Sequence, residues 1–345
     1  MTYQFEQALE RMHRDQRIAG MAIALTDRTH TLWAKGFGAE SMERPRVSVT
    51  AHSLFRIASI TKIVSGSTIL RLVEEGLLSL DTPIREYLPW LTLSRPGATE
   101  QMTLRHLLSH TAGLPTEYTP DGPREESALE PRLRECLPTL PLATLPAEGV
   151  HHYSNWGLHL ASHIAERVTG QRFTALAKAY ILDPLGMTDT TFDLRVAATH
   201  PLALPHERDA SGAPTVAHYI KENAARMAAG GLYSNATDLC RLARYLLNDG
   251  KNDKGEQVVP ASAIREMRRE HAKVPPIYKD GYGLTMRIHR YGDKVLYGHL
   301  GSAPPYSSSL FTDPVSGYGI AVLINTECDD LRYAIPEMIL DELTT

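Results

Sequence analysis

Cysteine is scarce in this sequence of 345 residues, which contains only Cys136, Cys240 and Cys328. The number is odd, the spacing is wide and no CxxC pair occurs, which argues against a disulfide framework and a structural zinc site. Such cysteine usage is typical of a protein from a reducing compartment. Cys240 falls on the apolar side of a helical pattern, so we expect a small core residue there.

Long apolar runs are also missing. No stretch approaches the roughly 20 consecutive apolar residues that cross a bilayer, so we expect no membrane-spanning segment and no membrane partner. Residues 1–27 contain no apolar run of the signal-peptide type, which predicts a cytoplasmic location.

Neither sign of charge dominates, because 36 basic and 40 acidic residues give a formal net charge of −4. The densest basic segment, residues 265–273, also contains Glu266 and Glu270, so it predicts a solvated helix face and not a nucleic-acid surface. We therefore expect a small molecule as the partner and no nucleic acid. The oligomeric state stays open.

Several signature motifs are absent as well. The sequence has neither the GxSxG elbow of α/β-hydrolases nor the GxGxxG loop of dinucleotide-binding proteins. His106 and His110 are four residues apart, but the glutamate that follows the first histidine in a zinc-binding HExxH is missing. His151 and His152 are adjacent and cannot share a face. We therefore expect no metal and no cofactor.

The helices and strands that are present follow apolar periodicity. Apolar residues at helical spacing predict a helix over 3–15, and a second helix begins at Ser59 and ends at Gly76. Further helices are expected at 157–169, 235–249 and 329–343, and strands at 20–27, 31–38, 293–299, 306–312 and 317–325.

The order of these elements predicts the architecture. An early hairpin and a late three-stranded meander imply one antiparallel sheet built from both chain ends and flanked by helices, an α/β fold of the α+β type. The sheet domain would comprise 1–84 and 206–345, with a mostly helical inserted domain at 85–205. Proline-rich residues 114–149 predict loops and short helices that could form the rim of a substrate cleft.

Ser59 and Lys62 form the first candidate catalytic pair. Side chains three residues apart meet on one face of a helix, so the lysine amine would lie beside the serine hydroxyl. A serine hydroxyl becomes a good nucleophile when a neighbouring base takes its proton, and a desolvated lysine can be that base. Backbone N–H groups at the helix N-terminus would also favour developing negative charge.

Two further motifs contain residues suited to chemistry. Tyr153 offers a phenol that can relay protons, and Asn155 an amide that can orient a carbonyl or the lysine. The alternative is a helix cap by Ser154 or Asn155. His299 and Gly301 follow at a predicted strand end, where glycine would allow a bound acyl group to approach the backbone closely. A satisfied structural histidine is the alternative there.

In their order and approximate spacing, Ser59-x-x-Lys62, Tyr153-x-Asn155 and His299-x-Gly301 resemble the three motifs of class C β-lactamase-like serine hydrolases. This superfamily also contains penicillin-binding proteins, esterases and D-aminopeptidases. The resemblance extends over about residues 5–340. It includes the segments 54–58 (LFRIA), 107–115 (LLSHTAGLP), 184–187 (PLGM) and 229–234 (AGGLYS).

The resemblance implies a role for each motif residue. Ser59 would attack a carbonyl and form an acyl-enzyme, while Lys62 and Tyr153 pass the proton to the leaving group. Asn155 would orient the substrate and Lys62. The backbone N–H groups of Ser59 and Ser302 would form the oxyanion hole.

Two departures from the family pattern bear on the substrate. His299 stands where lactamases and transpeptidases have a lysine that helps to hold a substrate carboxylate, and Pro304-Pro305-Tyr306 replaces the more usual Pro-Gly-Tyr. We therefore rank hydrolysis of a small ester or amide first, D-amino-acid peptide hydrolysis second and β-lactam hydrolysis third. Acyl transfer, and a non-enzymatic ligand-binding protein with a decayed site, are the remaining alternatives. Specificity should reside in the loops 116–150 and 200–225.

Overall fold

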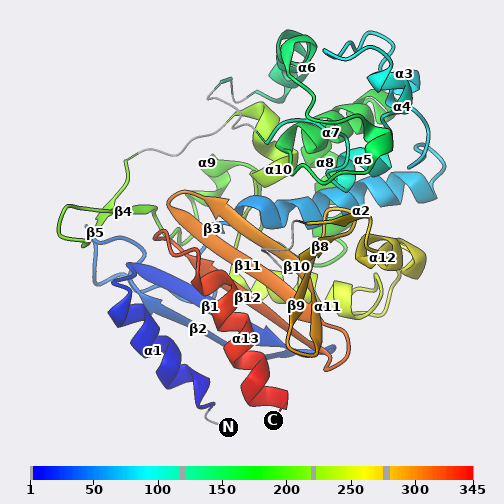
Figure 1. The fold of residues 1–345 in the computed structure, drawn as a ribbon. Helices are drawn as coiled ribbons and strands as arrows, with labels where there is room; N and C mark the ends of the chain where they lie inside the picture. The colour runs from blue at the N-terminus through cyan, green and yellow to red at the C-terminus, as the bar shows by residue number, and fades with distance from the viewer. Residues whose placement is uncertain (1–2, 117–121, 124, 219–222, 275–279, 345) are drawn as a thin grey trace.

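An antiparallel sheet built from both ends of the chain organises the molecule (Figure 1). The computed structural model describes residues 3–116, 122–123, 125–218, 223–274 and 280–344. Within these ranges the sheet has eight strands in the order β2-β1-β12-β11-β10-β9-β8-β7. They are β1 Gly20–Thr26, β2 Thr31–Gly38, β7 Ala272–Lys273, β8 Asp280–Tyr282, β9 Arg287–Tyr291, β10 Lys294–Ala303, β11 Tyr306–Asp313 and β12 Tyr318–Ile324. The predicted fold class is confirmed.

Strand β1 shows why the sheet lies between two layers of helices. Its alternate residues Met21, Ile23 and Leu25 belong to the apolar cluster under α1 (Phe5–Asp15) and α13 (Leu331–Thr344). The residues between them are alanines in the larger cluster on the opposite face. Because strand side chains alternate between faces, both faces of β1 are covered, and all seven residues are buried.

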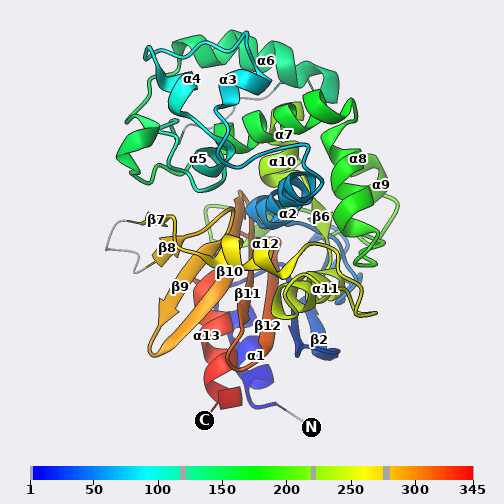
Figure 2. The same ribbon diagram turned by 90° about the vertical axis from the view of Figure 1, so that its right-hand side faces the viewer.

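The second face of the sheet packs against α11 (Ala236–Leu247) and carries α2 (Thr61–Glu74) above it (Figures 1 and 2). Helix α11 begins as predicted, because the side chain of Asn235 accepts a hydrogen bond from the backbone N–H of Asp238. Cys240 is buried on this helix, and burial raises the pKa of its thiol to about 12. Its predicted place in the core is therefore confirmed.

Further helices form a layer beyond α2, in the upper part of Figure 2. They are α3 Ile84–Tyr87, α4 Ala98–Gln101, α5 Leu104–Leu108, α6 Leu129–Cys136, α7 Asn155–Thr169 and α8 Phe173–Ala177, whereas α9 Leu194–Ala197 packs near Leu54 and Tyr233. Helix α10 (Met227–Gly230) packs against α2 and α7, although it follows this stretch in sequence. One apolar cluster runs from this layer into the sheet. The predicted domain boundaries near residues 84 and 205 stay a prediction.

The remaining elements are small. Two-stranded pairs join β3 (Phe55–Arg56) to β6 (Tyr233–Ser234) and β4 (His206–Arg208) to β5 (Pro214–Val216). Helix α12 (Ala261–Arg268) contains only the first part of the basic segment 265–273, whose end forms strand β7, so the predicted helix face is present for residues 265–268 alone. None of the helices in the described ranges combines the length and the apolar character that a membrane span requires.

Two sequence-based expectations about the sheet are wrong. Strand β10 does not end at His299 but continues to Ala303, because each residue from Leu300 onward pairs with β11. The strands β7, β8 and β9 were not predicted at all. They are short, and β9 mixes charged and apolar residues, so they lack the apolar alternation that marks the other strands.

Candidate active site

Ser59 lies in a 3-10 turn, Ala58–Ile60 (η1), directly before α2 and not in the helix itself. Ala58 has a φ of +47°, a left-handed value uncommon for a residue with a side chain, so the backbone bends sharply before Ser59. Two hydrogen bonds of 3.0 Å hold Ile57, the residue before this turn. Its N–H donates to the carbonyl of Leu232, and its carbonyl accepts from Ser308 Oγ. The turn is therefore fixed from both sides.

Lys62 is fully buried in the first turn of α2. Its Nζ lies 2.8 Å from Ser59 Oγ, 2.9 Å from Asn155 Oδ1 and 2.7 Å from the carbonyl oxygen of Ala229. A protonated amine has three donors for these three oxygens, whereas a neutral amine has two donors and one lone pair. Because the oxygens of Asn155 and Ala229 can only accept, the lone pair of a neutral Lys62 would face the Ser59 hydroxyl.

The surroundings of Lys62 favour this neutral form. Burial lowers the pKa of Lys62, and the neighbouring Tyr153 opposes this shift without reversing it. The neutral amine is the form that can accept a proton from a serine hydroxyl. The expected contact between Ser59 and Lys62 is therefore present, in an environment suited to proton transfer.

Tyr153 and Asn155 come from the segment that leads into α7. Tyr153 Oη donates to Ser59 Oγ across 2.9 Å, and Lys62 Nζ lies 5.0 Å from the centre of the Tyr153 ring. Ser154 is at the N-cap position of α7 but makes no side-chain capping bond. The alternative interpretation of this motif as a helix cap therefore has no support. Tyr153 contacts Ser59 instead, and Asn155 contacts Lys62.

The third motif lies within β10, next to the turn that contains Ser59. A Cβ atom on Gly301 would lie 2.3 Å from the carbonyl oxygen of Ile57 and 2.1 Å from Ser308 Oγ. The absence of a side chain thus lets β10 approach this turn and β11, whereas the sequence predicted the close approach of a bound acyl group. Ser302, the next residue, faces the same cavity as Ser59.

His299, in the same strand, does not line that cavity, and only 1% of it is exposed. Its Nε2 is 2.8 Å from Tyr282 Oη, and its Nδ1 is 2.5 Å from the carbonyl oxygen of Leu300. Burial is the main cause that holds the pKa of His299 well below its usual value. A neutral ring cannot supply the positive charge of the lysine that it replaces.

Sequence analysis did not single out Tyr282 and weighed His110 only as a metal ligand. His110 Nε2 lies 3.1 Å from Tyr282 Oη, and His110 Nδ1 accepts a hydrogen bond of 3.2 Å from the backbone N–H of Ser154. His110 lies in the segment 107–115 that carries part of the family resemblance, so a signal for it existed. Tyr282 gave none, because its strand was not predicted.

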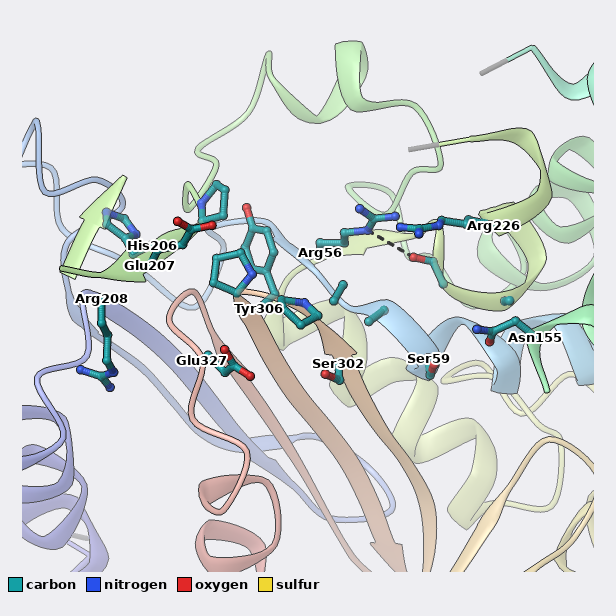
Figure 3. A pocket seen from close by; sticks show the side chains of 17 residues that line it. Arg56, Ser59, Asn155, His206, Glu207, Arg208, Arg226, Ser302, Tyr306 and Glu327 are labelled. Carbon is teal, nitrogen blue, oxygen red and sulfur yellow. Dashed lines mark hydrogen bonds between the residues drawn. The ribbon is translucent and has the colours of Figure 1, made fainter. Parts of the chain in front are cut away.

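A cavity of about 720 Å³ opens beside Ser59 (Figure 3). Ser59 and Asn155 lie at one end of the view, and Arg208 and Glu327 lie at the other. Its size falls within the range of pockets that hold small molecules. The site is therefore large enough for a substrate that extends well beyond the bond attacked by Ser59.

The rim of the cavity differs from the expected one. It includes residues 205–208, 226, 229–230 and 302–306, with Pro304 and Pro305 both in its wall and joined by a cis peptide bond. The described residues of 114–149 take no part in it, so the prediction of a proline-rich rim is wrong for them. Residues 117–121, 124 and 219–222 of the two predicted specificity loops lie outside the described ranges.

The histidines considered as metal ligands are separated. His106 takes part in a capping box with Thr103 at the start of α5, while His110 is directed toward Tyr282. Within the ranges that the structure describes, no group of three or more His, Cys, Asp or Glu side chains is placed to hold a metal ion.

Residues 5–340 match the family model described as Beta-lactamase. The chain belongs to the Beta-lactamase family. The match covers nearly the whole sequence, which confirms the resemblance inferred from the three motifs, and with it the serine hydrolase class of enzyme.

Two curated relatives are identical to this member of the Beta-lactamase family at about a quarter of the aligned positions. Penicillin-binding protein 4 of Amycolatopsis lactamdurans is 27% identical over 284 residues, which is 81% of this chain and 74% of the relative. Protein flp of Staphylococcus aureus is 26% identical over 329 residues, or 93% of this chain. The chain spans only 62% of the length of protein flp.

Solved structures agree with the fold. An octameric penicillin-binding protein homologue from Pyrococcus abyssi superposes with a TM-score of 0.81 at 26% identity, covering 99% of this chain and 76% of that one. EstCE1, described as a hydrolase with promiscuous acyltransferase activity, superposes with a TM-score of 0.82 at 21% identity, covering 98% and 97%. The second likeness is evidence for the fold alone.

Proposed function

We propose that this protein hydrolyses an ester or amide bond of a small substrate through an acyl-enzyme on Ser59. The observation that carries the proposal is the double contact of Ser59 Oγ, which lies 2.8 Å from Lys62 Nζ and 2.9 Å from Tyr153 Oη. A base and a phenol that both contact one hydroxyl suit a serine nucleophile, because the hydroxyl proton must leave as the serine oxygen attacks the carbonyl.

The hydrogen bonds around Ser59 support a specific path for that proton. Tyr153 donates to Ser59 Oγ, which leaves the serine hydrogen free to point at the lone pair of neutral Lys62. On attack, Ser59 Oγ bonds to the carbonyl carbon and its proton passes to Lys62. Tyr153 then gives its proton to the departing group and regains one from Lys62, and water releases the acyl group and restores Ser59.

The oxyanion formed during attack would be held by the backbone N–H groups of Ser59 and Ser302. Both residues line the cavity, and the missing side chain of Gly301 lets β10 lie against the turn that contains Ser59. Removing one such donor in other enzymes costs about a hundredfold to a thousandfold in kcat. Asn155, which contacts Lys62 and faces the cavity, would orient the amine and the substrate.

The environment of His299 favours esters and simple amides over β-lactams. The motif lysine of lactamases would contribute a positive charge for a substrate carboxylate, whereas His299 is buried with its pKa far below the usual value. A D-amino acid amidase of the same fold from Ochrobactrum anthropi supports the amide alternative, and EstCE1, a hydrolase with promiscuous acyltransferase activity, supports hydrolysis and acyl transfer. Acyl transfer stays open because one acyl-enzyme serves both outcomes.

Labelling with a fluorophosphonate, followed by intact-mass measurement, tests the nucleophile. The wild type should gain one label, and Ser59→Ala should gain none. Ser48→Ala, which changes an exposed serine, is the matched control and should label like the wild type. Equal labelling of Ser59→Ala and the wild type would overturn the proposal.

Comparison of p-nitrophenyl butyrate, a D-alanyl p-nitroanilide and nitrocefin tests the substrate class. The butyrate ester should have the highest kcat/KM and nitrocefin the lowest. Nitrocefin turnover well above ester turnover would contradict the interpretation of His299 as a neutral residue that replaces a cation.

A further inference from the structure

Behind Tyr153, three buried side chains form a chain of hydrogen bonds that the proposed reaction does not use. Tyr282 Oη lies 3.1 Å from His110 Nε2 and 2.8 Å from His299 Nε2, so it bridges the two rings. Each of the three residues is at most 2% exposed. The chain joins the segment after α5 to β8 and β10, and it reaches the back of the active site from a side that the cavity does not open on.

The two ends of the chain determine the direction of every proton in it. Ser154 N–H can only donate, so His110 Nδ1 must accept, and neutral His110 carries its proton on Nε2. The carbonyl of Leu300 can only accept, so His299 carries its proton on Nδ1 and Nε2 is a lone pair. Tyr282 therefore accepts from His110 and donates to His299.

We propose that Tyr282, with His110 and His299, is a positioning residue that holds Tyr153 and β10 in register with Ser59 through a hydrogen-bond chain of one fixed direction. The proposal rests on the proposed function of Ser59 and Tyr153, and it extends that function to residues that do not touch the substrate. His299 would act on the site indirectly, through its hydrogen bonds to Leu300 in β10 and to Tyr282.

Contacts on both sides of Tyr153 show how the chain would act on it. The backbone carbonyl of His110 accepts a 2.7 Å hydrogen bond from His152 N–H. The ring of His110 accepts a second one, from Ser154 N–H. His110 thus holds the residues before and after Tyr153, and its ring centre lies 4.3 Å from the ring centre of Tyr153. A shift of His110 would therefore move the phenol that contacts Ser59.

The other end of the chain acts on β10. His299 Nδ1 lies 2.5 Å from the carbonyl of Leu300, which directly precedes Gly301 and the proposed oxyanion donor Ser302. One bridging hydroxyl, that of Tyr282, therefore connects the segment of the phenol to the strand that holds the oxyanion donor. These two parts of the site come from segments that lie far apart in the sequence.

Burial is the main cause that opposes an added proton on either ring, and only the hydrogen bond from His299 to the carbonyl of Leu300 favours one. The basic side chains nearby, which add to the effect of burial when they are charged, are Lys62 from α2, His151 from the segment before α7, Arg287 from β9 and Arg332 from α13. A proton added to either ring would also place two donors opposite each other at one of the hydrogen bonds, which is costly in a buried site. Both histidines should therefore stay neutral across the working pH range.

Nitrogen-15 NMR of histidine-labelled wild type at pH 7 tests the fixed direction. Ring-proton couplings distinguish the two neutral tautomers, and the signals are assigned through His110→Asn and His299→Asn. We expect a neutral Nε2–H ring for His110 and a neutral Nδ1–H ring for His299. The same tautomer in both rings, or a charged ring in either, would overturn the proposal. Because the wild type itself is observed, the result does not depend on whether a variant folds.

Kinetics of Tyr282→Phe test the positioning role. With p-nitrophenyl butyrate, kcat should fall about tenfold to a hundredfold, as for small misplacements of catalytic groups, while KM stays within about twofold. In nitrogen-15 spectra, His299 of Tyr282→Phe should take up a proton at a higher pH than in the wild type, because it loses the donor that keeps it neutral. Tyr245→Phe, which alters an equally buried tyrosine on α11, should leave kcat and the histidine signals unchanged.

A kcat within twofold of wild type, with an unchanged titration of His299, would refute the positioning role. A failure of the proposed function is recognised separately, because Ser59 would then take no fluorophosphonate in either the wild type or Tyr282→Phe. The tautomers in the NMR spectrum would still report on the chain itself.

Discussion

Substituting Gly301 with alanine should disturb the active site without removing any catalytic group. The added Cβ would lie 2.3 Å from the carbonyl oxygen of Ile57 and 2.1 Å from Ser308 Oγ. An ordinary contact begins near 3.4 Å, so β10 and the turn that contains Ser59 must separate by about 1 Å. Overpacking of this kind costs about 1–3 kcal/mol of the free energy of unfolding.

The loss of activity should be larger than this loss of stability suggests. A misplacement of about 1 Å between a nucleophile and its oxyanion donors can cost about a hundredfold in rate. We therefore expect kcat/KM of Gly301→Ala for p-nitrophenyl butyrate to fall about a hundredfold, with a folded protein and a modestly lowered Tm. Adding Ser308→Ala removes one of the two clashes, so it should restore part of the stability but little of the rate.

Gly122→Ala is the control for this experiment, because the nearest atom to its added Cβ, Asn223 Cβ, lies 3.8 Å away. It should retain wild-type kcat/KM and Tm. If Gly301→Ala keeps more than half of the wild-type activity, the close packing of β10 on the turn is not what aligns the site, and the reasoning fails.

Two further predictions concern charged groups. Arginine stays protonated at all working pH values, so Lys62→Arg should lower kcat/KM by about a hundredfold or more. The wild-type rate should rise with pH and level off below the ordinary lysine pKa, because burial lowers the pKa of Lys62. Burial opposes charge on His289, but hydrogen bonds of 2.8 Å to Asp280 and Glu337 outweigh it and raise its pKa. This stabilisation is complete below about pH 6.5 and is lost as the pH rises through the raised pKa of His289, so urea unfolding of His289→Gln should show a loss of about 3–5 kcal/mol at pH 6 that shrinks at higher pH. A loss that does not depend on pH would contradict the charged assignment.

The sequence predicted those parts of the fold whose apolar pattern is strong. Strands β1 and β12 are almost continuously apolar, and the predicted spans of β1, β2, β11 and β12 agree with the structure within a few residues. Helices α2, α7 and α11 have one clear apolar face and end signals such as Gly76 and Asn235. The motif residues Ser59, Lys62, Tyr153 and Asn155 could be predicted because each motif is local.

The rest depended on contacts between distant segments. The three strands at the far edge of the sheet are short and partly charged, so their conformation follows from pairing with β10 and not from their own sequence. The end of β10 was placed too early because Gly301 and Ser302 have little strand preference, and the pairing of Ser302 with Ser307 extends the strand. Tyr282 could not be predicted, because its role requires His110 and His299 on two other segments.

The antiparallel pairing of β1 with β12 also determines when the protein can become active during its synthesis. Met21 pairs with Ile324, so one edge of the early hairpin stays unpaired until residue 324 has left the ribosome, which adds roughly 5–20 residues per second. Ser308, which holds the residue before the Ala58–Ile60 turn, arrives equally late. The growing chain therefore carries its nucleophile for many seconds before it can react, and during that interval the unpaired edge of β1 is the surface that most needs protection from other chains.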